Sequence, residues 1–68
     1  MTVARVTEIS ATSPKSFDDA VQHGIARAGK TLRNMKSAWV KEQKVVIEDG
    51  KVTMFKVNLA VTFVLEEA

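Results

Sequence analysis

The chain has 68 residues, ten basic and eight acidic side chains and a formal net charge of +2, with no cysteine and one histidine. This composition excludes disulfides and thiolate metal sites, argues against a transition-metal site and gives little support for nucleic-acid binding, because the basic residues are scattered. A domain of this size buries only about 60% of the surface that its unfolded chain exposes, so we expect oligomerisation to supply the stability that disulfides do not.

The sequence shows no signal for a membrane or for export. No apolar run approaches the roughly 20 residues that cross a bilayer, and the amino terminus lacks the basic-then-apolar pattern of a secretion signal. Internal repeats and linkers are also missing from the sequence. We therefore expect a single domain over residues 1–68 in a soluble, cytoplasmic protein without a membrane partner.

The first element is expected to be a strand. Residues 2–10 are rich in β-branched side chains and end in the small polar cluster Ala11-Thr12-Ser13-Pro14, which predicts a strand followed by a turn. The pattern of this strand does not assign its two faces.

A helix is predicted over residues 16–34. Ser16 and Asp19 form a capping box, and the residues that follow are apolar at helical spacing. Acidic side chains at the start and basic ones at the end complement the helix dipole. The basic end consists of Lys30, Arg33 and Lys36. Small side chains one turn apart predict that the helix lies close to a curved sheet. They are Ala20, Gly24 and Ala28.

A β-hairpin is predicted around Asp49-Gly50, because this dipeptide between strand-like residues 37–48 and 51–65 favours a two-residue type I′ turn. If Glu48 pairs with Lys51, one side of the sheet carries the pairs Val45 with Met54, Gln43 with Lys56, Lys41 with Asn58 and Trp39 with Ala60. Ala38, Val40 and Val46 then lie on the other side. A three-residue turn with a bulge shifts this pairing by one residue.

Residues 53–65 alternate without exception between two faces, which predicts a long strand with one fully apolar side. That side consists of Phe55, Val57, Leu59, Val61, Phe63 and Leu65. The fold predicted is α+β, with the order β-α-β-β and a three-stranded antiparallel sheet wrapped around one helix. The opposite face carries Trp39, and because one helix covers only one side, we expect another subunit to cover it. Trp39 is then either an interface anchor, which is the commoner role, or a platform for a planar ligand held between subunits.

This order of elements and several segments of the chain resemble the dodecin family over almost the full length. The matching segments are Val6-Thr7-Glu8-Ile9, Thr12-Ser13-Pro14, Gly24-Ile25-Ala26-Arg27-Ala28, Thr31-Leu32-Arg33 and Val61-Thr62-Phe63-Val64-Leu65-Glu66. The resemblance implies a hollow sphere of twelve subunits. It also implies that pairs of flavins stack between tryptophans at two-fold contacts, with a glutamine addressing the edge of the isoalloxazine ring.

The chain departs from the flavin-binding members of that family at two positions. An alignment without gaps over residues 31–50 places the family's stacking tryptophan at Ser37, whereas the tryptophan here is Trp39, two residues along on the same face. Lys56 stands where glutamine is usual, and a lysine donates hydrogen bonds but accepts none. The leading hypothesis is a homododecamer that binds and stores flavin (riboflavin, FMN or FAD). Its ligand contacts are then Trp39 by stacking, with Ser37, Gln43 and Lys56 around it.

The alternative is a shell of the same fold that binds another ligand, with Trp39 only as an interface anchor. The segment Val40-Lys41-Glu42-Gln43 resembles family members described as ion-binding or of unknown ligand. A cation, coenzyme A or another phosphorylated metabolite is then the expected ligand. For a cation, carboxylates meeting across symmetry axes are suitable ligands. The candidates are Glu8, Glu42, Asp49 and Glu66.

Enzymatic activity and nucleic-acid binding are not expected. The chain has one histidine and neither cysteine nor tyrosine, so it offers few groups for acid-base or nucleophilic catalysis, and no catalytic or metal-ligating residue is assigned. His23 is expected on the exposed side of the helix. A sheet that reads RNA is expected to show several exposed aromatic residues, whereas only Trp39 is expected on the open face.

Overall fold

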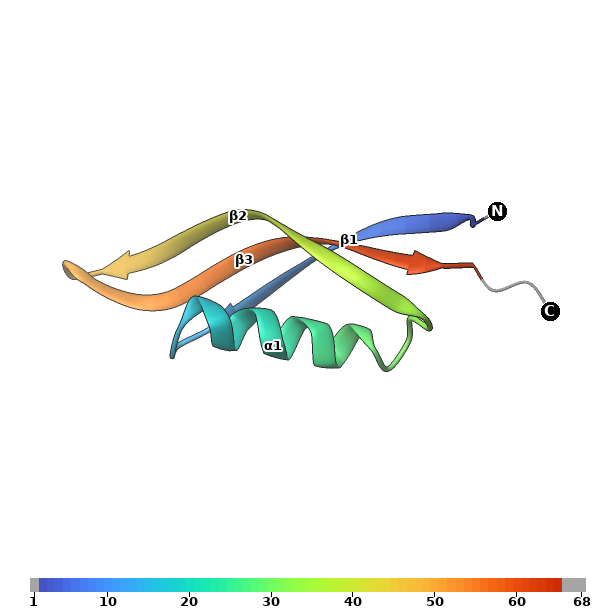
Figure 1. The fold of residues 1–68 in the computed structure, drawn as a ribbon. Coiled ribbons are helices and arrows are strands. Elements are labelled where there is room, and N and C mark those ends of the chain that lie inside the picture. Colours follow the sequence, from blue (N-terminus) through green and yellow to red (C-terminus); the bar gives the residue numbers. More distant parts are fainter. Residues whose placement is uncertain (1, 66–68) are drawn as a thin grey trace.

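The computed structural model describes residues 2–65, which form a β-α-β-β unit (Figure 1). The elements are β1 (Ala4–Ser13), α1 (Phe17–Ala28), β2 (Met35–Glu48) and β3 (Lys51–Val64). β3 lies between β1 and β2 and is antiparallel to both. The predicted fold class is therefore confirmed. No helix within residues 2–65 has the length and apolarity that crossing a membrane requires.

The core lies between α1 and the central strand. α1 crosses one face of the sheet, where it contacts β1 and β3 (Figure 1). Val57, Leu59 and Val61 of β3 are fully buried and cluster with Ala20 of the helix. Phe17 meets Phe55 edge to face, with ring centroids 5.1 Å apart. The apolar side of β3 therefore packs against the helix, as predicted.

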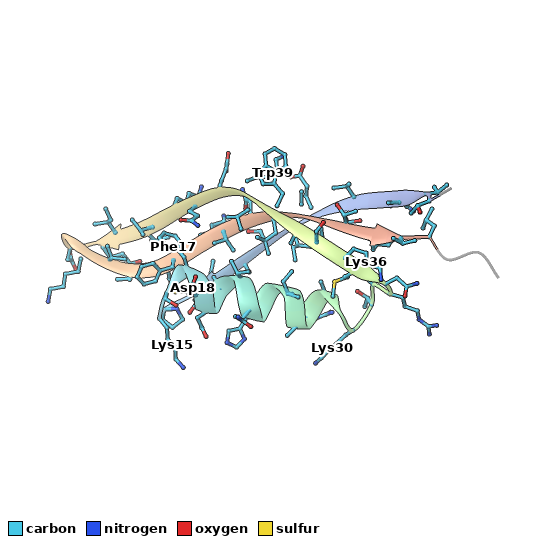
Figure 2. The ribbon with its side chains drawn as sticks, in the orientation of Figure 1. Lys15, Phe17, Asp18, Lys30, Lys36 and Trp39 are labelled. Carbon is cyan, nitrogen blue, oxygen red and sulfur yellow. The ribbon has the colours of Figure 1, made fainter. Side chains whose placement is uncertain are left out.

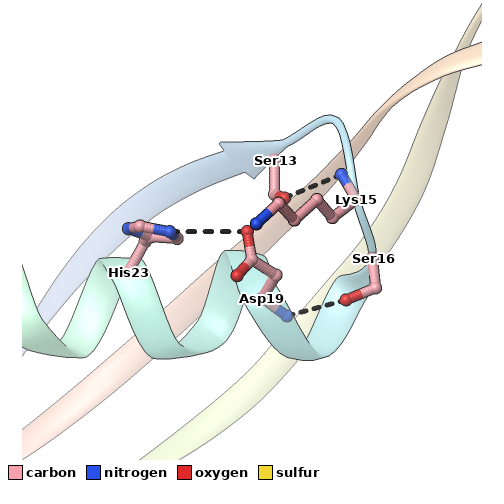
Figure 3. Close-up of polar contacts among 5 residues, drawn as sticks. All are labelled: Ser13, Lys15, Ser16, Asp19 and His23. Atoms are coloured by element: carbon pink, nitrogen blue, oxygen red, sulfur yellow. Dashed lines mark hydrogen bonds and ion pairs between the residues drawn. The ribbon is translucent and has the colours of Figure 1, made fainter.

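The start of α1 is held by three hydrogen bonds around Asp19. The Oγ of Ser16, the N-cap residue, accepts from the Asp19 N–H at 2.9 Å (Figure 3). The buried Ser13 donates its hydroxyl to the Asp19 carboxylate at 2.6 Å and accepts from the Lys15 N–H at 2.9 Å. The predicted helix start is confirmed, and the same carboxylate ties the helix to the end of β1.

The predicted end of the helix at residue 34 is wrong, because α1 ends at Ala28. The N–H groups of Thr31 and Leu32 both donate to the Ala28 carbonyl, at 3.1 and 2.8 Å, so the chain tightens into a turn. Asn34, with φ 61°, then leaves the helical region. The apolar residues that suggested further helix pack on the core from outside α1. Leu32 does so from the turn, and Met35 does so as the first residue of β2. The basic residues at the predicted helix end consequently lie beyond α1. They are Lys30, Arg33 and Lys36.

The tight approach of helix and sheet is confirmed at the predicted small residues. Ala20, Gly24 and Ala28 are the buried residues of α1. A Cβ added at Gly24 lies 3.1 Å from the Ala11 Cβ and 3.4 Å from a Leu59 methyl group. The first of these distances is shorter than ordinary van der Waals contact, so any side chain at this helix position forces its neighbours to shift by a few tenths of an ångström.

The hairpin turn forms as predicted, and its register is partly as predicted. Asp49 and Gly50 both have positive φ, 53° and 76°, as a type I′ turn requires. Glu48 pairs with Lys51, and Trp39 pairs with Ala60. Both ends of the predicted register are therefore confirmed.

The register between these two ends is wrong by one residue, because two irregularities offset each other. The pairing skips Thr53 of β3 near the turn, and it skips Lys41 of β2 further along. Neighbouring side chains of a strand alternate between the two faces of the sheet. A shift of one residue therefore moves each side chain of β2 between the irregularities to the face opposite the predicted one. The pairs observed between the irregularities are Val46 with Met54, Val45 with Phe55, Lys44 with Lys56, Gln43 with Val57 and Glu42 with Asn58.

Candidate ligand-binding face

The sheet face turned away from α1, called the outer face below, carries Trp39 (Figure 2). Trp39 points away from the helix and is 67% exposed. Its neighbour on β3 is Ala60, and the neighbour of Ala60 on β1 is Glu8. A large aromatic ring beside an alanine leaves room for a planar ligand or for a side chain of another subunit.

Lys41 is held over this ring by an ion pair. Its Nζ donates to a Glu8 carboxylate oxygen at 2.9 Å and lies 5.7 Å from the centroid of the Trp39 ring. Lys41 is the residue that the β2–β3 pairing skips, so the bulge allows its side chain to reach across β3 to β1. The two edge strands, β1 and β2, are thus linked by a charged contact beside the indole.

The pKa of Lys41 is raised above its ordinary value of 10.5, first by the hydrogen bond that its ammonium donates to Glu8 and then by the charge of Glu8. When the pKa of a lysine is higher in the folded than in the unfolded protein, its interaction stabilises the fold fully at pH values below the ordinary pKa. This stabilisation is lost as the pH rises through the raised pKa. The Lys41 ammonium therefore keeps its charge through neutral pH and loses it only at strongly alkaline pH. In an NMR titration, we expect the Lys41 midpoint to lie above 10.5 and to fall in Glu8→Gln. Equal midpoints in the two proteins would show that Glu8 does not hold this ammonium.

A second polar contact lies one row further along the outer face. The Asn58 side-chain amide donates to a Glu42 carboxylate oxygen at 2.9 Å. Asn58 of β3 and Glu42 of β2 are cross-strand partners, which confirms that the bulge places Glu42 on this face. Both carboxylates beside Trp39, Glu8 and Glu42, therefore already have partners within the chain.

The next row carries two lysines opposite each other. Lys44 of β2 pairs with Lys56 of β3, and Thr12 of β1 is the neighbour of Lys56 on its other side. Opposing residues of an antiparallel pair have Cβ atoms about 5 Å apart, and like charges in such positions repel. Within residues 2–65 neither ammonium forms an ion pair.

Three of the four ligand contacts predicted from the sequence lie on the outer face. Trp39, Ser37, which pairs with Thr62, and Lys56 share this side of the sheet. Gln43 does not, because it pairs with the core residue Val57 and so belongs to the side of α1. The expectation that Gln43 and Lys56 lie side by side is therefore wrong, and the bulge is the reason.

Sequence reasoning did not include Lys41 or Lys44 among the ligand contacts, and it named Glu8 only as a candidate ligand of a cation. The predicted register gave Lys41 a place in the ladder, whereas the structure leaves it unpaired and free to reach Glu8. The predicted register put Gln43 and Val45 on the outer face, and therefore put Lys44, between them, on the side of the helix. Glu8 lies on a strand whose faces the sequence did not assign, and only its pairing with Ala60 settles its side.

The side of the sheet that faces α1 also has an opening. A groove of about 540 Å³ lies between β1 and α1, lined by apolar Ile9, Ala11 and Leu32 and by the polar His23 and Arg27, among others. His23 is exposed, as predicted, and its Nε2 lies 3.4 Å from the Asp19 carboxylate (Figure 3). This histidine is therefore a surface residue with an acidic neighbour one helical turn away.

Comparison with known proteins identifies the class. The family model described as Dodecin matches residues 3–66. The dodecin of Thermus thermophilus is 38% identical over 65 residues, which cover 96% of this chain and 94% of that protein. The calcium dodecin of Mycobacterium tuberculosis is 32% identical over 69 residues, covering 100% of this chain and 96% of that protein. The solved structure of a dodecin from Streptomyces davaonensis superposes with a TM-score of 0.92 at 38% identity, with 97% of each chain covered.

The fold and the exposed sheet face define a small β-α-β-β protein with an aromatic residue on an uncovered sheet. The chain belongs to the dodecin family, as the resemblance in its sequence indicated. Within that family it is similar both to proteins named simply dodecins and to one named for calcium.

Proposed function

We propose that this protein assembles through its outer face into a hollow dodecamer that binds and stores flavin at the contacts between subunits. The flavin ring stacks on Trp39, and the role of the shell is to sequester the flavin rather than to convert it. Stacking on an indole quenches flavin by electron transfer, so a stored flavin is also protected from light.

The observation that carries this proposal is the 67% exposure of Trp39 on a long sheet face that α1 does not cover. A small protein rarely leaves such a surface in water, and tryptophan is enriched at the centres of subunit contacts. The small Ala60 beside the indole leaves the ring accessible to a planar partner. A shell formed on this face encloses whatever is bound there.

A second candidate is a cation, which the similarity to the calcium dodecin supports. Glu8 and Glu42 supply carboxylates on the outer face, but each is engaged by a side chain of its own subunit. Residues 2–65 hold no cluster of three or more His, Cys, Asp or Glu side chains suited to a metal ion. A cation site therefore needs carboxylates from several copies. Asp49 lies in the hairpin turn, and Glu66 falls outside the described residues.

Flavin binding is tested by titrating riboflavin and FMN with the purified protein and following ligand fluorescence. We expect strong quenching with the native protein, loss of most of it in Trp39→Ala, and partial retention in Trp39→Phe, which keeps a smaller aromatic ring. Native mass spectrometry of the same samples should report the dodecamer and any added flavin mass.

Undiminished fluorescence of both flavins at saturating protein would reject flavin storage. In that case a calcium titration monitored by thermal unfolding decides the second candidate. A rise of the unfolding temperature with calcium but not with magnesium supports a calcium site, since the two cations differ in size and in the number of ligands they take.

A further inference from the structure

The groove between β1 and α1 plays no part in the function proposed above. Its volume is about 540 Å³, within the range of about 300–1,000 Å³ that is common for small-molecule sites. It lies on the helix side of the sheet, whereas the proposed assembly and flavin contacts use the outer face. A molecule bound in this groove therefore does not compete for the outer face.

The floor of the groove is apolar. Ile9 and Ala11 of β1 and Leu32 of the turn after α1 line it, and each of them is only half-buried. The helix contributes Gly24 and Ala28, whose small size leaves the space beside β1 unfilled. An alkyl group placed there removes the rest of this apolar surface from water, which is favourable in proportion to the area covered.

The groove is long and narrow. Thr7 and Ala11, which both line it, lie four residues apart along β1, a distance of about 13 Å. At Gly24 the helix and the strand are so close that an added Cβ lies 3.1 Å from the Cβ of Ala11. Such a shape accommodates a linear chain lying along β1 better than a fused ring system.

The groove has one cationic side chain without an acidic partner. Of its titratable lining residues, His23 already lies 3.4 Å from the Asp19 carboxylate (Figure 3). The other is Arg27, whose guanidinium forms no ion pair in the described part of the chain. A planar guanidinium donates two parallel hydrogen bonds to a carboxylate. Because the negative end of the helix dipole lies nearby, at the end of α1, binding of an anion here depends strongly on Arg27.

We propose that this groove binds a free alkyl carboxylate, such as a medium-chain fatty acid, with its chain on Ile9 and Leu32 and its carboxylate on Arg27. The apolar floor and the single unpaired cation match the two parts of such a ligand. A multiply charged ligand fits less well, because the groove offers it one such cation beside a mainly apolar surface. The inference does not rest on flavin binding.

The inference is tested by NMR with decanoate and with protein labelled at the δ1 methyl groups of isoleucine. The chain has three isoleucines, of which Ile9 lines the groove and Ile47 is exposed in the hairpin. We expect decanoate to shift the Ile9 signal and to leave the Ile47 signal in place. Acetate, which has no alkyl chain, should shift neither signal.

The role of the guanidinium is tested by comparing dissociation constants in two variants. In Arg27→Gln, decanoate should bind at least about tenfold more weakly, because charge-assisted hydrogen bonds are lost. The matched control is Lys30→Gln, which removes a positive charge from the helix side but not from the groove (Figure 2), and its affinity should stay within about twofold of the native value. Decanol, which has the same chain without the charge, should bind the native protein and Arg27→Gln equally.

Three results would overturn the proposal. They are an Ile9 signal that decanoate leaves in place, an unchanged decanoate affinity in Arg27→Gln, and an equal loss of decanol binding in that variant. The last result would show that Arg27 shapes the groove rather than holding the carboxylate. None of these results bears on flavin binding at the outer face.

Sedimentation velocity of Thr31→Arg tests the other occupant of the groove, a second copy of the chain. Thr31 is exposed and lines the groove, so a long charged side chain there interferes with a subunit seated on it. A particle of native mass supports an open groove. Dissociation of the particle would identify the groove as a subunit contact and reject the fatty-acid site.

Discussion

Trp39→Asp is expected to dissociate the assembly into small species. Trp39 lies near the middle of the outer face, where the proposed subunit contacts form. A carboxylate there must be buried next to the Glu8 and Glu42 side chains, and the ammonium of Lys41 beside it is already engaged by Glu8. Burying an unpaired charge costs several kcal/mol, and the cost recurs at every contact of a symmetric shell.

Sedimentation velocity measures this effect directly. Twelve copies of the 7.5 kDa chain form a particle of about 90 kDa. The native protein should sediment at that mass and Trp39→Asp at the mass of one or a few chains. His23→Asp is the control, because His23 is exposed on the helix side and its replacement should leave the particle whole. An intact particle in Trp39→Asp would show that the contacts lie elsewhere on the molecule.

Gly24→Val is expected to destabilise the core strongly. The Cβ alone lies 3.1 Å from Ala11 and 3.4 Å from Leu59, so the two further methyl groups of valine have no room unless α1 moves away from the sheet. Overpacking of this kind typically costs about 1–3 kcal/mol of the free energy of unfolding, and separation of the helix from Leu59 exposes core surface in addition. For a domain of this size, we expect the unfolding temperature to fall by about 10 °C or more.

Thermal unfolding at one fixed protein concentration measures this loss, because association contributes to the apparent stability. Ala26→Val is the matched control. Ala26 is an exposed residue of the same helix, so valine there costs only its lower helix propensity, about 0.5 kcal/mol. If both variants unfold at the same temperature, the close approach at Gly24 does not limit the packing of α1.

The bulge at Lys41 affects both the structure and the proposed ligand face. It releases Lys41 from the ladder, so that its ammonium reaches Glu8 on the far strand, beside the ring of Trp39. Together with the irregularity near the turn, it also places Lys44 rather than Gln43 opposite Lys56. Two local irregularities therefore determine which side chains surround the indole and which charge a ligand meets.

Local sequence signals determined the elements of this fold and one face of its sheet. The alternation of residues 53–65 assigned Val57, Leu59 and Val61 to the core, since side chains along a strand point to opposite faces in turn. Asp49-Gly50 determined the turn, because it supplies positive φ at two successive positions. Ser16 determined the helix start through its hydrogen bond to the backbone. Trp39 and Lys56 were placed on the correct face, and the family was indicated by short matching segments.

The tertiary structure decided the features that depend on pairing between distant residues. The helix ends at Ala28 although apolar spacing continues, because Met35 has to start a strand beside Phe63. The side of Glu8 depends on its pairing with Ala60, which no pattern within β1 reveals. The neighbour of Lys56 depends on two irregularities in the pairing of β2 with β3. Because a shift of one residue exchanges the two faces of a strand, such irregularities change the composition of the ligand face while the fold stays the same.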